Sequence, residues 1–289
     1  MVGNNIADEV LFVDGLTVDG KVFCEDWRRF AGGQAANVAA TLSHLGLPTV
    51  FVGRFGGDEA GKFTRDALRD AGVVVPDIAI AAGRTMSAIV AVDRLRHQRT
   101  ILMRRDPALM REPLPIGAID LEEIGILYGD GFERQAFLVL ARQMRDLGRP
   151  VVSDLEQRSP DDARLLALVT HLVAPAEILR DLAGEPETVS AILRLTKAGP
   201  SIVVATQGGD GAVGTDGDTV VTVPAETCDV TDTTGAGDAF HAGFMAGLHQ
   251  GLDLKETLRL ANRVAAVKCT QPGPKATAPS LAPFRWSAA

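Results

Sequence analysis

Cysteine is scarce in this chain, and long apolar runs are absent. The 289 residues include three cysteines, Cys24, Cys228 and Cys269, which lie far apart and lack the paired spacing of zinc ligands. This spacing argues against a disulfide framework and against a zinc site. No apolar run approaches membrane-spanning length, and residues 1–5 do not begin a basic and then apolar export signal. A reducing, cytoplasmic location fits these absences.

Positive charge is also in short supply. The chain has 29 Lys and Arg against 37 Asp and Glu, which gives a net charge of -8. Nucleic acids and anionic membranes need a basic surface, so neither is expected as a partner. With 46% hydrophobic and 23% charged residues, the composition is that of an ordinary globular protein. A chain of this length forms one large α/β domain or two small ones.

From Ile124 onward, strand-length apolar runs alternate with segments of helical periodicity. Strands are predicted at 124–128, 151–154, 171–174 and 202–205, with helices at 133–147 and 161–169 between them. Such alternation predicts right-handed crossovers and a mostly parallel sheet covered by helices on both faces. The last segment, Pro272–Ala289, is rich in proline and alanine and is predicted to be a surface tail.

Two earlier segments do not fit that sheet. Val10–Phe30 and Met86–Arg104 read as extended chain with turns at Asp19-Gly20 and near His97, which is typical of hairpins. We expect both to form a small β lid over the carboxyl ends of the parallel strands, where a lid would exclude water from a site. Additional edge strands of the main sheet are the alternative.

The most informative motif is the run from Asp232 to Asp238, Asp-Thr-Thr-Gly-Ala-Gly-Asp. Its glycines allow the backbone to approach a phosphate closely, and the first N–H groups of a helix predicted at Ala236–Gln250 would hold phosphate oxygens. Asp238 would lie beside the transferred group and accept a proton from an attacking alcohol. A helix entry whose glycines only permit tight packing is the alternative interpretation.

Four motifs in order resemble those of the ribokinase-like, or PfkB, family of carbohydrate kinases. They span nearly the whole chain and are Gly32–Asn37 followed by Leu45-Gly46, Gly53–Gly61, Thr206–Gly211 and Asp232–Asp238. The resemblance implies a single domain, residues 1–289, with a three-layer αβα sandwich, a mostly parallel sheet and a small β lid. It also implies ATP as the phosphoryl donor, with Mg²⁺ carried by ATP.

The same resemblance implies roles for individual residues. Asp238 would be the catalytic base, and the anion hole would consist of Gly235, Ala236 and Gly237. Substrate binding would fall to Asp8, Gly32, Gly33, Asn37 and Arg105. ATP binding would fall to Thr206, Gly208, Gly211 and Asn262. A solvated turn at Asp8 and a merely helix-bracing role for Asn37 are the alternatives.

The chain also departs from the family pattern. Ala174 stands where the family's magnesium-linked motif has an asparagine, although Glu177 is present, so no metal ligand is assigned. Only Met1 and Val2 precede Gly3, where the family has a full strand. Asp232 and Thr234 resemble a loop that binds a monovalent cation in some members. A homodimer formed through the lid is a further expectation.

Two segments bear on the substrate. Met103–Ala108, with Arg104 and Arg105, resembles the arginine-containing segment of fructokinases and 2-keto-3-deoxygluconate kinases. Lys21 and Val267–Gly273 are similar to kinases of sulfofructose. The sequence therefore predicts an ATP-dependent kinase acting on a primary hydroxyl of a ketose or an acidic sugar. A nucleoside kinase and a non-catalytic sugar or nucleotide sensor are the alternatives, and a solvated charge pair is the alternative for the two arginines.

Overall fold

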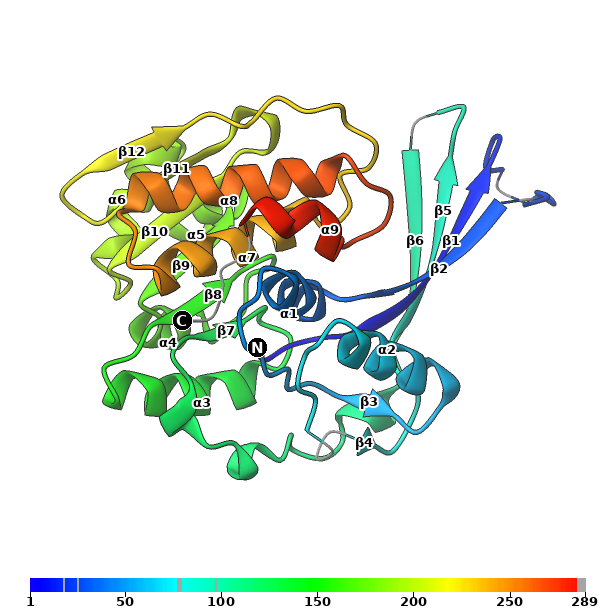
Figure 1. The fold of residues 1–289 in the computed structure, drawn as a ribbon, viewed down its shortest axis with the longest axis horizontal. Coiled ribbons are helices and arrows are strands. Elements are labelled where there is room, and N and C mark those ends of the chain that lie inside the picture. Colours follow the sequence, from blue (N-terminus) through cyan, green and yellow to red (C-terminus); the bar gives the residue numbers. More distant parts are fainter. Residues whose placement is uncertain (18, 25, 77–79, 97, 285–289) are drawn as a thin grey trace.

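Buried apolar strands from the second half of the chain form the larger of two main sheets (Figure 1). The computed structural model describes residues 1–17, 19–24, 26–76, 80–96 and 98–284. Strands β7 to β10 run parallel, and β11 and β12 continue the sheet in antiparallel fashion. Their bounds are β7 Leu127–Gly129, β8 Val151–Asp154, β9 His171–Pro175, β10 Ile202–Thr206, β11 Ala212–Thr215 and β12 Val220–Val223.

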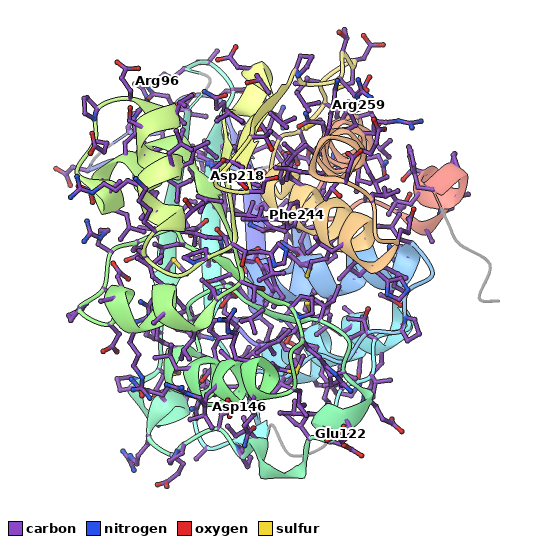
Figure 2. All side chains as sticks on the ribbon, turned by 90° about the vertical axis from the view of Figure 1, so that its left-hand side faces the viewer. Arg96, Glu122, Asp146, Asp218, Phe244 and Arg259 are labelled. Carbon is purple, nitrogen blue, oxygen red and sulfur yellow. The ribbon has the colours of Figure 1, made fainter. Side chains whose placement is uncertain are left out.

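Helices cover this sheet on both faces because alternate strand residues are buried on opposite sides. In β10, Val203 and Ala205 pack with helices α3 to α6, whereas Val204 packs with α1, α7 and α8. Figure 2 places Phe244 of α7 in the interior, and its side chain is fully buried. The predicted three-layer arrangement is therefore confirmed. The bounds are α1 Gln34–His44, α2 Glu59–Asp70, α3 Arg134–Asp146, α4 Asp162–Leu168, α5 Ala176–Ala183, α6 Thr188–Thr196, α7 Ala236–His249 and α8 Leu254–Cys269.

The start of the chain joins the larger sheet beside β7. Val2 forms parallel bridges to Gly129 on one side and to Val52 on the other. Its backbone N–H donates to the carbonyl oxygen of Tyr128 at 2.8 Å. An isolated bridge thus lies in the sheet at the position where the family was expected to have a full strand. The two-residue strands β3 (Phe55–Gly56) and β4 (Ile80–Ala81) pair with each other nearby.

The two predicted hairpin segments form a separate sheet of four strands in the order β2-β1-β5-β6. It stands to one side of the larger sheet, next to α2 (Figure 1). The first segment begins at Ile6 and not at Val10, because β1 pairs with β2 on one side and with β5 on the other. The turn expected near His97 falls outside the described residues. The bounds are β1 Ile6–Val13, β2 Asp26–Gly32, β5 Ser87–Asp93 and β6 Gln98–Arg104.

The predicted surface tail is only partly correct, because several of its residues pack into the core. Ala276 and Leu281 are fully buried and belong to the core between α1 and α8. Leu281 ends the short helix α9 (Ala278–Leu281), which contacts both of those helices. Proline and alanine dominate the segment, so its few buried positions left no periodic signal. Short 3₁₀ turns occupy η2 Pro107–Met110, η3 Ile116–Ala118, η4 Leu121–Glu123, η5 Gly208–Asp210 and η6 Ala282–Phe284.

Within the part of the chain that the structure describes, no helix combines the length and apolarity needed to cross a membrane. The strand predicted at 124–128 is shorter than expected and begins at Leu127, because η4 precedes it.

Candidate active site

The predicted phosphate-binding turn opens helix α7. Gly235 is the N-cap with a φ of 75°, a left-handed conformation that glycine adopts without strain. A Cβ atom at Gly235 would also collide with the carbonyl oxygen of Pro274. The Ala236 N–H donates to the Thr233 carbonyl at 3.1 Å and closes the turn, whereas no described residue accepts from the Gly237 N–H. The start of α7 therefore offers free donors at the positive end of a helix, where anions bind.

Asp238 lies in the first turn of α7 and is only 8% exposed. Nδ2 of Asn37, from α1, donates to Oδ2 of Asp238 at 2.7 Å across 201 residues of sequence. Oδ1 of Asn37 is buried and has no hydrogen-bond partner among the described residues. An unpaired buried acceptor costs free energy, so this oxygen could still accept a hydrogen bond from a donor.

The protonation of Asp238 depends on its neighbours. Burial raises the pKa of its carboxyl to about 7, and the negative charge of Asp154 raises it as well. The hydrogen bond from Asn37 and the charge of His241 lower this pKa. Oδ1 of Asp154 lies 3.7 Å from Nε2 of His241, which follows Asp238 by one helical turn. A carboxyl whose pKa lies near neutral pH is well matched to general-base catalysis.

Asp8 lies in β1, which excludes a solvated turn at this position. Its carboxylate occupies the space beside Gly32 of β2, since a Cβ atom on Gly32 would collide with Oδ2 of Asp8. Burial raises the pKa of Asp8 to about 6, and the positive charge of Lys275 opposes this rise. Burial lowers the pKa of Lys275 to about 8, although the negative charges of Asp8 and Asp238 raise it. Our sequence analysis missed Lys275, because a lone lysine in a segment rich in proline and alanine signals no such interaction.

Asp130, which follows β7, was also missed and fixes the predicted sugar-binding turn. Its Oδ2 accepts hydrogen bonds from the N–H of Asn4 at 2.9 Å and of Ala35 at 3.1 Å. Gly33, the N-cap of α1, packs so closely here that a Cβ atom would lie 2.7 Å from the carbonyl oxygen of Asn4. Burial raises the pKa of Asp130 to about 6, and its hydrogen bonds from the backbone oppose the rise. An acidic residue directly after a buried parallel strand was the available signal.

The predicted nucleotide residues gather where β10 and β12 end. Thr206 is the last residue of β10, Gly208 begins the turn η5, and Gly211 follows that turn. A Cβ atom on Gly211 would collide with the carbonyl oxygen of Val223. Nδ2 of Asn262, from α8, donates to that same carbonyl at 3.2 Å. The structure therefore brings Asn262 and Gly211 to one place.

The two arginines at the end of β6 lie in different surroundings. Arg105 is exposed, and its guanidinium carbon lies 4.9 Å from the centroid of the Phe132 ring. The N–H of Phe132 donates to Oδ1 of Asp130 at 2.9 Å, so Arg105 lies near the Asp130 turn. Nη2 of Arg104 lies 4.0 Å from Oδ2 of Asp58, on another face of the small sheet.

A cavity of about 580 Å³ separates the four-stranded sheet from the turn before α7. Asp8 and apolar side chains, among them Val10, Val90 and Met103, line it from the sheet. Residues 231–235 and 272–274 line it from the opposite side. Arg105 does not line this cavity.

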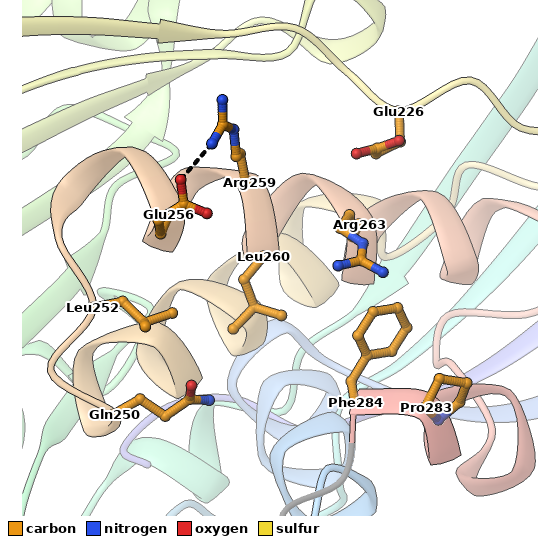
Figure 3. A pocket seen from close by; sticks show the side chains of 9 residues that line it. All are labelled: Glu226, Gln250, Leu252, Glu256, Arg259, Leu260, Arg263, Pro283 and Phe284. Carbon is orange, nitrogen blue, oxygen red and sulfur yellow. Dashed lines mark hydrogen bonds and ion pairs between the residues drawn. The ribbon is translucent and has the colours of Figure 1, made fainter.

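A second cavity, of about 690 Å³, lies on the other side of α8 (Figure 3). Arg259 pairs there with Glu256, and the guanidinium carbon of Arg263 lies 4.9 Å from the centroid of the Phe284 ring. None of the residues assigned to the site by the sequence lines this cavity. It is therefore separate from the turn that precedes α7.

Metal ligands are the least defined part of the site. Ala174 is buried in β9 and offers no oxygen from its side chain, and Glu177 is exposed in the first turn of α5. Among the described residues, no group of three or more His, Cys, Asp or Glu side chains is arranged to hold a metal ion. The residues present therefore assign no protein ligand to Mg²⁺.

Comparison with known proteins agrees with this geometry. The model of the pfkB family of carbohydrate kinases matches residues 1–281. This chain belongs to the pfkB family. A fructokinase from Klebsiella pneumoniae is 33% identical over 234 residues, which cover 75% of this chain and 76% of the relative. This chain is thus a phosphotransferase with an alcohol group as acceptor.

Two further comparisons show the range of the family. A nucleoside kinase from Methanothermobacter thermautotrophicus is 29% identical over 248 residues, or 83% of this chain and 78% of the relative. The structure of Arabidopsis thaliana ribokinase complexed with ribose and ATP superposes with a TM-score of 0.84 at 25% identity and covers 98% of this chain and 96% of that one. The ribokinase-like fold is therefore established. Because relatives with different acceptors share this fold, it does not identify the acceptor of this chain.

Asp8 should make the stability of the protein depend on pH. Its pKa is about 6 in the folded protein against a usual 3.8, so folding takes up a proton between these values. The stability that Asp8 contributes at low pH is consequently lost as the pH rises through 6. We therefore compare the unfolding free energy of Asp8→Asn with that of wild type at each pH. As the pH rises from 4 to 8, the difference should shift in favour of the variant by about 1–3 kcal/mol. Urea unfolding of both proteins at several pH values measures this, and a pH-independent difference would contradict it.

Proposed function

We propose that this protein transfers the γ-phosphoryl group of ATP to a primary hydroxyl group of a small sugar, with a ketose as the first candidate. The observation that carries the proposal is the buried Asp238, held by Asn37 beside a turn with free N–H donors. A carboxylate and an anion-binding turn at one helix start are what phosphoryl transfer to an alcohol requires.

In this proposal, Asp238 accepts the proton of the attacking hydroxyl group while the oxygen forms its bond to the γ-phosphorus. The bond from phosphorus to the bridging oxygen breaks, and ADP leaves with that electron pair. Gly235, Ala236 and Gly237 would surround the transferred oxygens, which the N-terminal end of α7 favours electrostatically. Mg²⁺ carried by ATP would neutralise charge on the phosphates.

The sugar would lie between the small sheet and α1. Asp8, Gly32, Gly33 and Asn37 converge there, and the unpartnered Oδ1 of Asn37 would accept from a sugar hydroxyl group. The small sheet would act as a lid, because the 580 Å³ cavity lies directly beneath it. Thr206, Gly208, Gly211 and Asn262 would line the nucleotide on the other side.

A screen for ADP release tests the function. The panel contains fructose and other ketoses, aldoses, 2-keto-3-deoxygluconate and sulfofructose as acidic sugars, and nucleosides. We expect ATP-dependent release with a ketose and little with nucleosides. Absence of release with every acceptor, together with intact ATP binding, would favour the non-catalytic sensor.

A nucleoside kinase is the second candidate, and one observation favours it. The cavity beneath the small sheet is lined largely by apolar side chains such as Val10, Phe12, Val90 and Ile101. Apolar walls suit a nucleobase better than they suit the hydroxyl groups of a sugar. Preferential release of ADP with a nucleoside would therefore replace the ketose as substrate.

Asp238→Asn should keep the fold and the affinity for ATP but lower kcat by about 10²–10⁴-fold, the usual contribution of a general base. The amide is close in size to the carboxyl group and cannot accept the proton. Steady-state kinetics with the best acceptor, alongside calorimetric titration with ATP, separates the two properties. Near-wild-type turnover would refute the assignment of the base.

Arg105 and Arg104 form a matched pair for testing an acidic substrate. We propose that Arg105 contacts an anionic group of the acceptor, since it lies near the Asp130 turn whereas Arg104 faces Asp58. Arg105→Ala should lower kcat/KM for an acidic sugar about tenfold or more relative to a neutral analogue, because a charge-assisted contact is lost. Arg104→Ala is the control. If both variants keep the wild-type preference between the acidic sugar and its neutral analogue, the neutral ketose becomes the better candidate substrate.

We also propose that two copies associate through the small sheet. The face of this sheet turned away from the cavity exposes the apolar side chains Trp27, Ile89 and Leu102, which a second copy would cover. Sedimentation velocity should give a dimer for wild type and a monomer for Leu102→Glu. Val189→Glu, at an exposed apolar position in α6, should remain a dimer. A wild-type monomer at micromolar concentration would contradict the proposal.

A further inference from the structure

A fully buried lysine holds the turn that precedes the catalytic helix. Lys268 lies in the last turn of α8, and its side chain has no exposed surface. Nζ donates to the carbonyl oxygen of Asp232 at 2.6 Å and to that of Gln271 at 3.2 Å. A charged ammonium is rarely buried in this way without a compensating partner.

The carboxylate of Asp232 supplies that compensation. Its Oδ1 accepts from the N–H of Thr234 at 2.8 Å, and its Oδ2 accepts from the N–H of Gly273 at 2.8 Å. Burial lowers the pKa of the Lys268 ammonium, and the negative charge of Asp232 is the largest opposing effect. The ammonium thus bonds to the carbonyl oxygen of Asp232, while the carboxylate of the same residue offsets its charge.

The family resemblance allows a monovalent cation beside Asp232 and Thr234, but the residues present do not fit one. A potassium ion needs several oxygen atoms in place of its hydration shell. Here the ammonium of Lys268 already occupies the place between the carbonyl oxygens of Asp232 and Gln271, which a cation in this turn would need as ligands. A second cation would also repel the ammonium at short range.

We infer that the Lys268 ammonium takes the place of a monovalent cation, so that the enzyme works without one. Lys268 is thus a positioning residue. It acts through Asp232, whose carboxylate accepts a hydrogen bond from the Gly273 N–H. Pro274 follows Gly273, and its carbonyl packs against Gly235. This chain of contacts links the ammonium to the turn that would hold the phosphoryl group.

The inference rests on the proposed function for its kinetic readout only, because thermal unfolding tests it without any substrate. Unfolding midpoints of wild type are compared in KCl, NaCl, CsCl and tetramethylammonium chloride at one ionic strength. We expect the same midpoint in every salt, since nothing binds K⁺ selectively. A midpoint that rises selectively with K⁺ would overturn the inference even if no acceptor were ever found.

Substitution of Lys268 gives the second arm. In tetramethylammonium chloride, Lys268→Ala should lose about tenfold or more in kcat/KM, and K⁺ or NH₄⁺ should restore several-fold of it by filling the vacated space. Lys268→Met removes the charge but fills the space, so it should lose activity without being restored. Lys255→Ala, at an exposed position in the same helix, is the matched control and should resemble wild type.

Two kinetic outcomes would overturn the inference. One is wild-type activity that K⁺ raises about fivefold or more over tetramethylammonium, a change far larger than general screening by salt produces. The other is a Lys268→Ala variant that is as active as wild type in every salt. If Lys268→Ala does not fold in tetramethylammonium chloride, folding in KCl or NH₄Cl but not in NaCl would support the inference. If the variant folds in none of these salts, the unfolding midpoints of wild type decide the question.

Discussion

Removing the Asp238 carboxyl from water is the constraint on which the rest of the site depends. An isolated buried carboxylate is costly, so it either takes up a proton or gains partners. Asn37 is the nearest partner, and its amide reaches Asp238 only because α1 and α7 pack together on one face of the larger sheet. The close packing of these helices therefore keeps the carboxyl paired, since a shift between them would break its hydrogen bond with Asn37.

His241 adds a second layer to this support. Its ring nitrogens lie 2.8 Å from the carbonyl oxygen of Gly237 and 3.2 Å from that of Val173. Carbonyl oxygens only accept, and an imidazole donates from both nitrogens only when it is protonated. Burial lowers the pKa of His241, while these two carbonyls and the charge of Asp238 raise it. Burial has the larger effect, so the pKa of His241 is lowered overall. Because the charges of His241 and Asp238 favour each other, the protonation of one group affects that of the other.

Sequence patterns were sufficient wherever the physical cause was local. The helical stripes and the glycine turn before Asp238 act over a few residues, and the structure has the helices and strands close to where they were expected. Contacts between distant segments left no such trace. Lys275 interacts with Asp8 from the other end of the chain, and Lys268 became recognisable as a buried cation only once the turn at Asp232 was placed beside it. The start of β1 at Ile6 likewise depends on pairing with two other strands.

Both lysines lie beside carboxylates that offset their charge. The net charge of -8 describes the whole surface, but local partners decide the field at a site. Lys268 is already balanced by Asp232. Lys275 faces Asp8 and Asp238, and with a pKa of about 8 it is charged at neutral pH, when Asp8, with a pKa of about 6, is mostly ionised. The Lys275–Asp8 pair then carries little net charge, so the acceptor side of the site offers no surplus cation to an acidic group. This balance favours a neutral ketose, unless Arg105 supplies the missing charge.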